Sequence, residues 1–140
     1  MHQYRFLIIP AISWASVQIF KFIVSLVKNK EVDVKVLVAS GGMPSSHSSV
    51  VTSLMTLIGM SEGFDSIAFA ISFVFGLIVM YDAAGVRRAA GKQAGILNKI
   101  IYSNQVKVDT NEKLKELIGH TPKQVFVGAL WGIILGLIFA

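Results

Sequence analysis

The sequence has no cysteine, so disulfides and thiolate metal sites are excluded. Acidic residues are scarce: 8 Asp and Glu stand against 13 Lys and Arg, and the net charge is +5. Histidine occurs only three times, and no His or Asp spacing matches a metal-ligand motif. We therefore expect no metal and no other cofactor. Since internal repeats and low-complexity tracts are also absent, residues 1–140 are predicted to form a single domain.

Long apolar runs dominate what is present. More than half of the residues are apolar, and the basic residues lie between the runs rather than in one patch. This distribution is typical of membrane proteins and argues against nucleic-acid binding. No signal-peptidase site follows the first run, so it is interpreted as a retained span. We expect an all-α integral membrane protein, a bundle of four transmembrane helices near 6–27, 44–60, 67–84 and 124–140.

The connection 85–123 is amphipathic and is expected to be cytoplasmic. Its first part has apolar residues at helical spacing, which predicts a helix lying on the membrane surface. These residues are Val86, Ala90, Ala94, Leu97 and Ile101. A second short helix is predicted with Leu114, Leu117 and Ile118 on one side, ending at Gly119. Residues 121–124, TPKQ, then have the pattern of a capping box that begins the last span.

Basic residues predict the orientation in the plasma membrane. They are concentrated in residues 28–43 and 85–123, whereas the turn 61–66 has two acids and no base. Because cytoplasmic loops are enriched in Lys and Arg, both basic loops should face the cytoplasm and both termini the outside.

Residues 41–49, GGMPSSHSS, are the most distinctive local pattern. Serine favours a helix N-cap, and the preceding glycines allow a close backbone approach to a ligand. Such a helix start offers free N–H groups, hydroxyls and the imidazole of His47, a combination that suits a phosphate. The alternative interpretation is a serine-capped membrane helix with an incidental histidine.

Charged and imidazole side chains from the other segments should meet this helix start at the cytoplasmic end. Lys21 either extends to the interface or contributes to a site, because charges inside spans are costly and often functional. Asp82 is expected to pair with Lys21 across the bundle. Histidine suits proton transfer or nucleophilic attack, and one arginine guanidinium can bind two oxygens of a phosphate at once. The residues expected to converge are Lys21, His47, Arg87, Arg88 and His120.

Three strings carry a resemblance to a known family: GGMPSSHS at 41–48, YDAAGVRRAAG at 81–91 and GHTP at 119–122. With them the sequence resembles the divergent branch of the type 2 phosphatidic acid phosphatase (PAP2) superfamily, related to acid phosphatases and vanadium-dependent haloperoxidases. The resemblance to the branch covers nearly the whole chain. The resemblance to the parent superfamily is local, through residues 44–47 and His120.

The resemblance implies a metal-independent phosphatase with a phosphohistidine intermediate, acting on a lipid phosphate or pyrophosphate at the cytoplasmic face. His120 would be the nucleophile and His47 the general acid. The implied phosphate-binding residues are Arg87 or Arg88, Lys21, Ser45 and Ser46, and Asp82 and Gln124 would support the site.

The sequence also departs from the parent pattern. The Lys-x6-Arg-Pro element is absent, the arginine lies upstream of its usual place, and Gln124 stands where an acid would orient the nucleophile. An alternative function therefore stays open, a non-catalytic membrane protein that binds anionic lipid headgroups or partners through the same basic face. Four short spans enclose little volume, so a homodimer that completes the site is a further expectation.

Overall fold

A computed structural model describes residues 2–29, 41–103, 114–116 and 118–140. These residues form a short 3-10 helix, η1 (His2–Tyr4), and five α-helices, with no strand in the described ranges. The helices are α1 (Arg5–Asn29), α2 (Ser46–Glu62), α3 (Ile67–Ala84), α4 (Val86–Ile101) and α5 (Pro122–Ile138). The all-α prediction is confirmed for this part of the chain, and α1, α2, α3 and α5 fall on the four expected segments.

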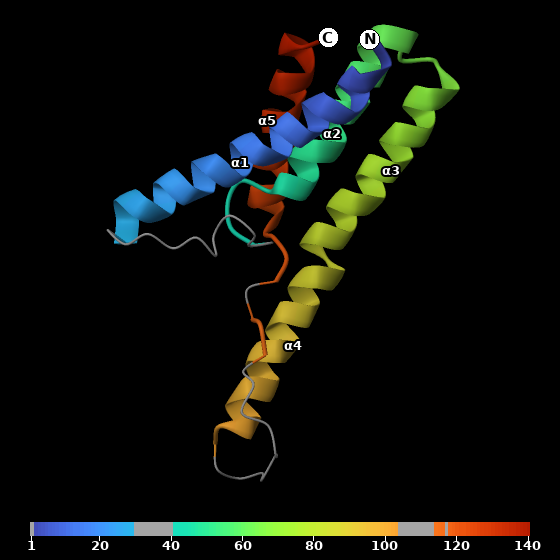
Figure 1. The fold of residues 1–140 in the computed structure, drawn as a ribbon. Helices are drawn as coiled ribbons and strands as arrows, with labels where there is room; N and C mark the ends of the chain where they lie inside the picture. Colours follow the sequence, from blue (N-terminus) through green and yellow to red (C-terminus); the bar gives the residue numbers. More distant parts are fainter. Residues whose placement is uncertain (1, 30–40, 104–113, 117) are drawn as a thin grey trace.

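The central helix is α2, which packs against α1, α3 and α5 (Figure 1). Its contact with α5 is close because three glycines of α5 are buried against it, Gly128, Gly132 and Gly136. A Cβ at Gly128 would collide with the Ser45 backbone, and one at Gly132 with Thr52 Oγ1 and the Ser49 carbonyl. Glycine is thus required by the backbone separation, as in the small-residue interfaces of membrane helices.

The order of these contacts makes α2 and α5 parallel neighbours. Gly128 faces the start of α2, and Gly136 faces Thr56, nearly three turns further along. Hydrogen bonds join the two helices as well, from Ser45 N to the Gln124 carbonyl (3.0 Å) and from Thr52 Oγ1 to the Ala129 carbonyl (3.0 Å). The N-termini of both helices therefore lie at the same end of the bundle.

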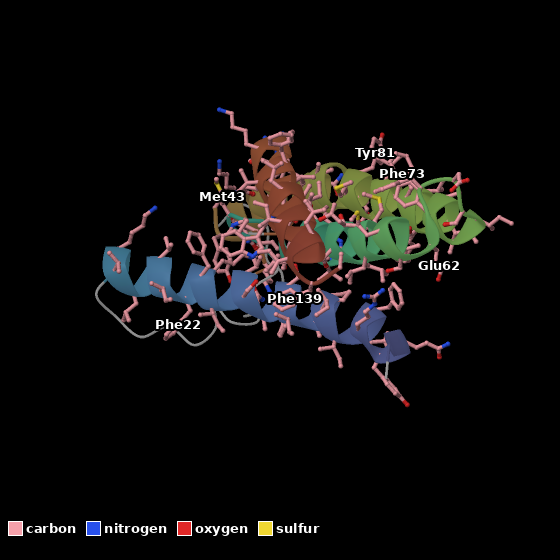
Figure 2. All side chains as sticks on the ribbon, turned by 90° about the horizontal axis from the view of Figure 1, so that it is seen from above. Phe22, Met43, Glu62, Phe73, Tyr81 and Phe139 are labelled. Carbon is pink, nitrogen blue, oxygen red and sulfur yellow. The ribbon has the colours of Figure 1, made fainter. Side chains whose placement is uncertain are left out.

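The interior is polar and the outside is apolar, the reverse of a water-soluble protein. Hydroxyl groups of α1 and α2 are buried, including Ser13, Ser49, Ser53 and Thr56. The outer face of α3 exposes aliphatic and aromatic side chains, and Figure 2 shows Phe73 and Tyr81 directed away from the other helices. This arrangement suits a surrounding of lipid.

Two helical runs of the described chain are long and apolar enough to cross a membrane, Arg5–Lys28 and Ile67–Ile101. Helix α5 is apolar but shorter, and α2 carries its buried hydroxyls instead of a continuous apolar surface. Four transmembrane spans therefore remain a prediction.

The helix α4 runs on from α3 in nearly the same direction and projects beyond the bundle (Figure 1). Most of the predicted apolar stripe does not pack: Val86, Ala90 and Leu97 are exposed. Its member Ala94 is buried, together with Gly91 and Asn98. A Cβ at Gly91 would collide with the main chain of Glu116 and Ile118, so the returning segment covers this side. The surface-lying orientation of α4 stays a prediction.

The predicted short helix with Leu114 and Ile118 on one side is wrong in its described residues, which are not helical. The reason is the buried side chain of Asn98. Its amide accepts from Leu114 N (3.0 Å) and donates to the Leu114 carbonyl (2.8 Å) and to Glu116 Oε1 (2.7 Å). These bonds replace those that a helical turn would form. Leu117 lies outside the described residues.

Candidate active site

Two histidines from distant parts of the sequence lie together at the end of the bundle where α2 and α5 begin. His47 is the second residue of α2, and His120 lies two residues before α5. Their ring centroids are 5.7 Å apart in an edge-to-face arrangement. The expected convergence of these two side chains is therefore observed, while their chemical roles stay predictions.

Three main-chain contacts hold His120 in place. Its N–H donates to the carbonyl of Ala83 at the end of α3 (2.9 Å). Gly119, with φ of +84°, packs directly on the backbone of Arg87 and Arg88, where a Cβ would collide. Nδ1 of the ring lies 3.0 Å from the Gly42 carbonyl. Since a carbonyl can only accept, Nδ1 carries the proton of the neutral ring and Nε2 keeps its lone pair.

The electrostatic surroundings keep the His120 ring neutral. Burial, and then the charges of Lys21 and His47, lower the pKa of His120 from the ordinary 6.5 to about 4, against the opposing effects of the Gly42 carbonyl and Gln124. The Nε2 atom is buried and has no hydrogen-bond partner among the described residues. A neutral imidazole with a buried, unshared lone pair is the form that acts as a nucleophile or base.

The side chain of Lys21 is buried in α1, only 6% exposed. Its Nζ has no hydrogen-bond partner in the part of the chain that the structure describes. Its charge acts on both His47 and His120, so it lies near the two rings. A buried cation without a carboxylate is costly unless an anion accompanies it. This favours the predicted site role of Lys21 over extension to the interface.

The predicted pair of Lys21 and Asp82 is wrong. Asp82 Oδ2 accepts from Arg87 Nε at 2.7 Å, and both side chains are partly exposed. The irregular backbone at Gly85 interrupts the helix between Asp82 and Arg87, and Asp82 pairs with this neighbouring arginine instead of Lys21. The charges of Asp82 and Arg87 both act on His47, whereas Arg88 is not among the described charges that act on either histidine.

The start of α2 has the expected N-cap. Ser45 Oγ accepts from Ser48 N (3.3 Å), and the Ser45 carbonyl accepts from Ser49 N. The amides of Ser46 and His47 occupy the first turn, where no intrahelical acceptor exists, and the helix dipole adds partial positive charge there. Ser45 thus supports the turn with its hydroxyl, and Ser46 is buried beside it.

The capping box at the start of α5 is confirmed. Thr121 N donates to Gln124 Oε1 (2.9 Å), and Gln124 N donates to Thr121 Oγ1 (3.4 Å). Gln124 therefore fixes the turn that follows His120, and the Gly42 carbonyl takes the position on Nδ1 that a carboxylate holds in other triads.

Sequence reasoning missed one contributor to the site, and one buried hydroxyl that follows His47 in the sequence. The main-chain carbonyl of Gly42 carries no side-chain signal, and only the adjacent glycines hinted at a close approach. The Ser48 hydroxyl is buried without a hydrogen-bond partner among the described residues. It lay inside the recognised string but was assigned no role.

The described residues contain no group of three or more His, Asp or Glu side chains that could hold a metal ion. An open cavity of about 330 Å³ lies elsewhere, lined by Asn98, Lys99, Tyr102 and Glu116.

Comparison with known proteins identifies the family to which the chain belongs. The family described as "Divergent PAP2 family" matches residues 2–135. The chain belongs to the divergent PAP2 family. It is also 41% identical over 135 residues to the uncharacterized membrane protein YuiD of Bacillus subtilis (strain 168), which covers 88% of this chain and 85% of that protein. No solved structure matches.

Membership of the divergent PAP2 family confirms the resemblance found in the strings at 41–48, 81–91 and 119–122. These strings supply His47, the helix break with Arg87, and His120 respectively. The segments that carry the resemblance are thus the segments that meet at the histidine pair.

Proposed function

We propose that this member of the divergent PAP2 family is a multi-pass plasma-membrane phosphatase that hydrolyses a lipid phosphate or pyrophosphate at the cytoplasmic face. The observation that carries the proposal is the ammonium of Lys21, which is buried beside the two histidines and has no hydrogen-bond partner among the described residues. A cation in this environment recruits an anion, and the two imidazoles supply a nucleophile and a proton donor.

The reaction would proceed in two displacements. His120 Nε2 attacks phosphorus while the bond to the leaving oxygen breaks, and protonated His47 donates its proton to that oxygen. Water then attacks the phosphohistidine, the N–P bond breaks, and His47 accepts a proton from the water. The products are the alcohol, or the shorter phosphate, and inorganic phosphate, with His120 and His47 restored.

Charge on the phosphoryl oxygens would be held by groups already in place. Lys21 and Arg87 supply positive charge, and the amides at the start of α2 supply hydrogen-bond donors with Ser45 and Ser46 around them. Such donors are strong in a site that excludes water, and losing one typically lowers the rate by roughly 10²–10³. Arg88 is the less favoured arginine, because Arg87 is the one whose charge acts on His47.

A membrane location is supported by the two long apolar helical runs, by the polar interior and apolar outside, and by the relative named as a membrane protein. The proposal includes three further predictions: four membrane spans, a cytoplasmic α4 that lies on the membrane surface, and a homodimer. A lipid phosphate is the natural substrate because its headgroup lies at the membrane boundary, where α2 and α5 begin.

The experiment is phosphate release by the purified protein from a panel of lipid phosphates, in detergent and with EDTA present. We expect release by the wild type, loss in His120→Ala, and acid-labile, base-stable phosphate on the wild type after rapid quenching. The matched control is His2→Ala, because His2 belongs to η1 at the opposite end of α1.

The second candidate function is binding of anionic headgroups without turnover, favoured by Gln124 standing where a triad has an acid. It predicts saturable binding of phosphate lipids, no release from any of them, and binding that survives His120→Ala. That result would contradict the phosphatase proposal.

A further inference from the structure

The break between α3 and α4 brings together two side chains that a continuous helix would separate. Asp82 and Arg87 are five residues apart, and on a regular helix only residues three or four apart face each other. Gly85, with φ of −101° and ψ of −89°, interrupts the helix between them. As a result Arg87 Nε donates to Asp82 Oδ2 at 2.7 Å.

This ion pair contributes little to stability, which points to another role. The side chains of Arg87 and Asp82 are 45% and 40% exposed. Pairs this accessible to water typically stabilise a fold by less than about 1 kcal/mol. What the contact does is fix the direction of one guanidinium next to His47, on whose ring the charges of both residues act.

The way in which Arg87 is held leaves its phosphate-binding atoms available. An arginine has five N–H donors, and the contact with Asp82 uses the one on Nε. The two terminal nitrogens carry the remaining four, arranged in the fork that matches two oxygens of a phosphoryl group.

The same break also holds the candidate nucleophile. His120 N donates to the carbonyl of Ala83, the residue after Asp82, and Gly119 packs on the backbone of Arg87 and Arg88. The relative position of Arg87 and His120 is therefore set by one short piece of chain.

We propose that Asp82 is a positioning residue, which holds Arg87 by Nε so that its terminal nitrogens meet the anion between His47 and His120. The inference rests on the proposed function, since it assigns Arg87 rather than Arg88 to the phosphoryl oxygens. It also predicts whether removal of Asp82 strengthens or weakens anion binding. Asp82 is itself negative, so simple Coulomb repulsion would make its removal strengthen anion binding, whereas a positioning role makes its removal weaken binding.

The test is a double-mutant cycle on vanadate affinity, measured by isothermal titration with the detergent-purified full chain. Arg87→Gln is expected to raise Kd roughly tenfold or more, since a hydrogen bond to a charged group is lost. Asp82→Ala should raise Kd about three- to tenfold, and Asp82→Ala in the Arg87→Gln background should add nothing. Asp82→Ala in the Arg88→Gln background should keep its full effect, which makes Arg88→Gln the matched control.

Three outcomes separate the possibilities. Unchanged or tighter vanadate binding by Asp82→Ala overturns the positioning role and leaves the proposed function intact. Independent, multiplying effects of Asp82→Ala and Arg87→Gln also overturn it. Absence of vanadate binding in the wild type overturns the proposed function and this inference together. Asp82→Asn, which keeps the shape of the side chain, replaces Asp82→Ala if the latter fails to fold.

Discussion

At the residue scale, the orientation of His120 depends on a main-chain acceptor. The Gly42 carbonyl holds the proton on Nδ1 and supplies no full negative charge, so the ring is positioned without being made more basic by an acid. Burial and the nearby Lys21 then lower the pKa of His120 to about 4. The result is an imidazole that stays neutral well below the pH at which a free histidine becomes charged.

This pKa predicts how stability depends on pH. In the folded protein the pKa of His120 is lowered from 6.5 to about 4, so between these values the unfolded chain binds an extra proton and stability falls as the pH falls. The slope from one such group is at most about 1.4 kcal/mol per pH unit. Thermal unfolding in detergent from pH 7 to 4 should show a weaker pH dependence for His120→Gln than for the wild type. Equal dependence in both proteins would contradict the prediction.

Lys21, whose buried ammonium has no hydrogen-bond partner in the described part of the chain, makes a second prediction. Replacing a buried charge that lacks a protein partner by an apolar side chain of similar shape removes a desolvation cost. Lys21→Met should therefore stabilise the anion-free protein, by about 1–3 kcal/mol, and abolish vanadate binding. Thermal unfolding and titration measure the two effects. Lys28→Met, at the exposed end of α1, is the control and should change neither. Destabilisation by Lys21→Met would show that its ammonium is paired in the protein.

At the element scale, the contact of α2 with α5 determines where the two helix starts lie. Gly132 has no room for a methyl group, because its Cβ would collide with Thr52 Oγ1 and the Ser49 carbonyl. Any side chain there pushes the two backbones apart and moves the start of α5, and with it His120, away from His47.

Gly132→Ala is therefore expected to destabilise the fold by about 1–3 kcal/mol and to weaken vanadate binding. The control is Gly95→Ala in α4, where the nearest atom to an added Cβ is the flexible Glu116 carboxylate at 3.5 Å. That substitution should be neutral or stabilise by about 0.5–1 kcal/mol, because alanine favours a helix. Thermal unfolding of the two variants measures the difference, and equal stability of both would contradict the tight α2–α5 contact.

The sequence predicted the four main helices because each coincides with an apolar run. The failures came from single residues, one whose side chain competes with helical hydrogen bonds and one whose backbone interrupts a helix. Asn98 takes the main-chain groups of Leu114 and so prevents the expected short helix. The irregular backbone at Gly85 lies between Asp82 and Arg87, and Asp82 pairs with Arg87 instead of Lys21. Neither effect changes the spacing of apolar residues along the sequence, so the periodic pattern could not reveal it.

At the scale of the whole molecule, the polar interior and apolar exterior suit a surrounding of lipid, and the basic residues of 28–43 and 85–123 predict the orientation in the membrane. Because the chain contains no cysteine, single cysteines can be introduced to test this. Ser103→Cys should be protected from a membrane-impermeant maleimide in intact cells, and Glu62→Cys should react. Both positions are exposed in the structure, so a difference reports sidedness. The reverse labelling pattern would contradict the predicted orientation.

The site as a whole was partly predictable. His47 and His120 could be placed together, because His47 lies at the start of one predicted span and His120 just before another, and both spans were expected to begin at the cytoplasmic end. The Gly42 carbonyl could not be placed, since the backbone atoms of one glycine resemble those of any other until the chain is folded. Ser48 could not be distinguished from its serine neighbours, which donate within the helix while its own hydroxyl has no described partner.

The hydrogen bond from His120 to Gly42 has a consequence for the classification of related sequences. Enzymes that lose an acidic triad residue are commonly sorted with inactive pseudoenzymes, because the missing carboxylate is visible in an alignment. When a main-chain carbonyl accepts the hydrogen bond from the histidine ring, the acceptor cannot be recognised from the residue type in an alignment. On the proposed function, a relative should therefore be assessed from the loop around position 42 and from its imidazoles, and not from an absent acid alone.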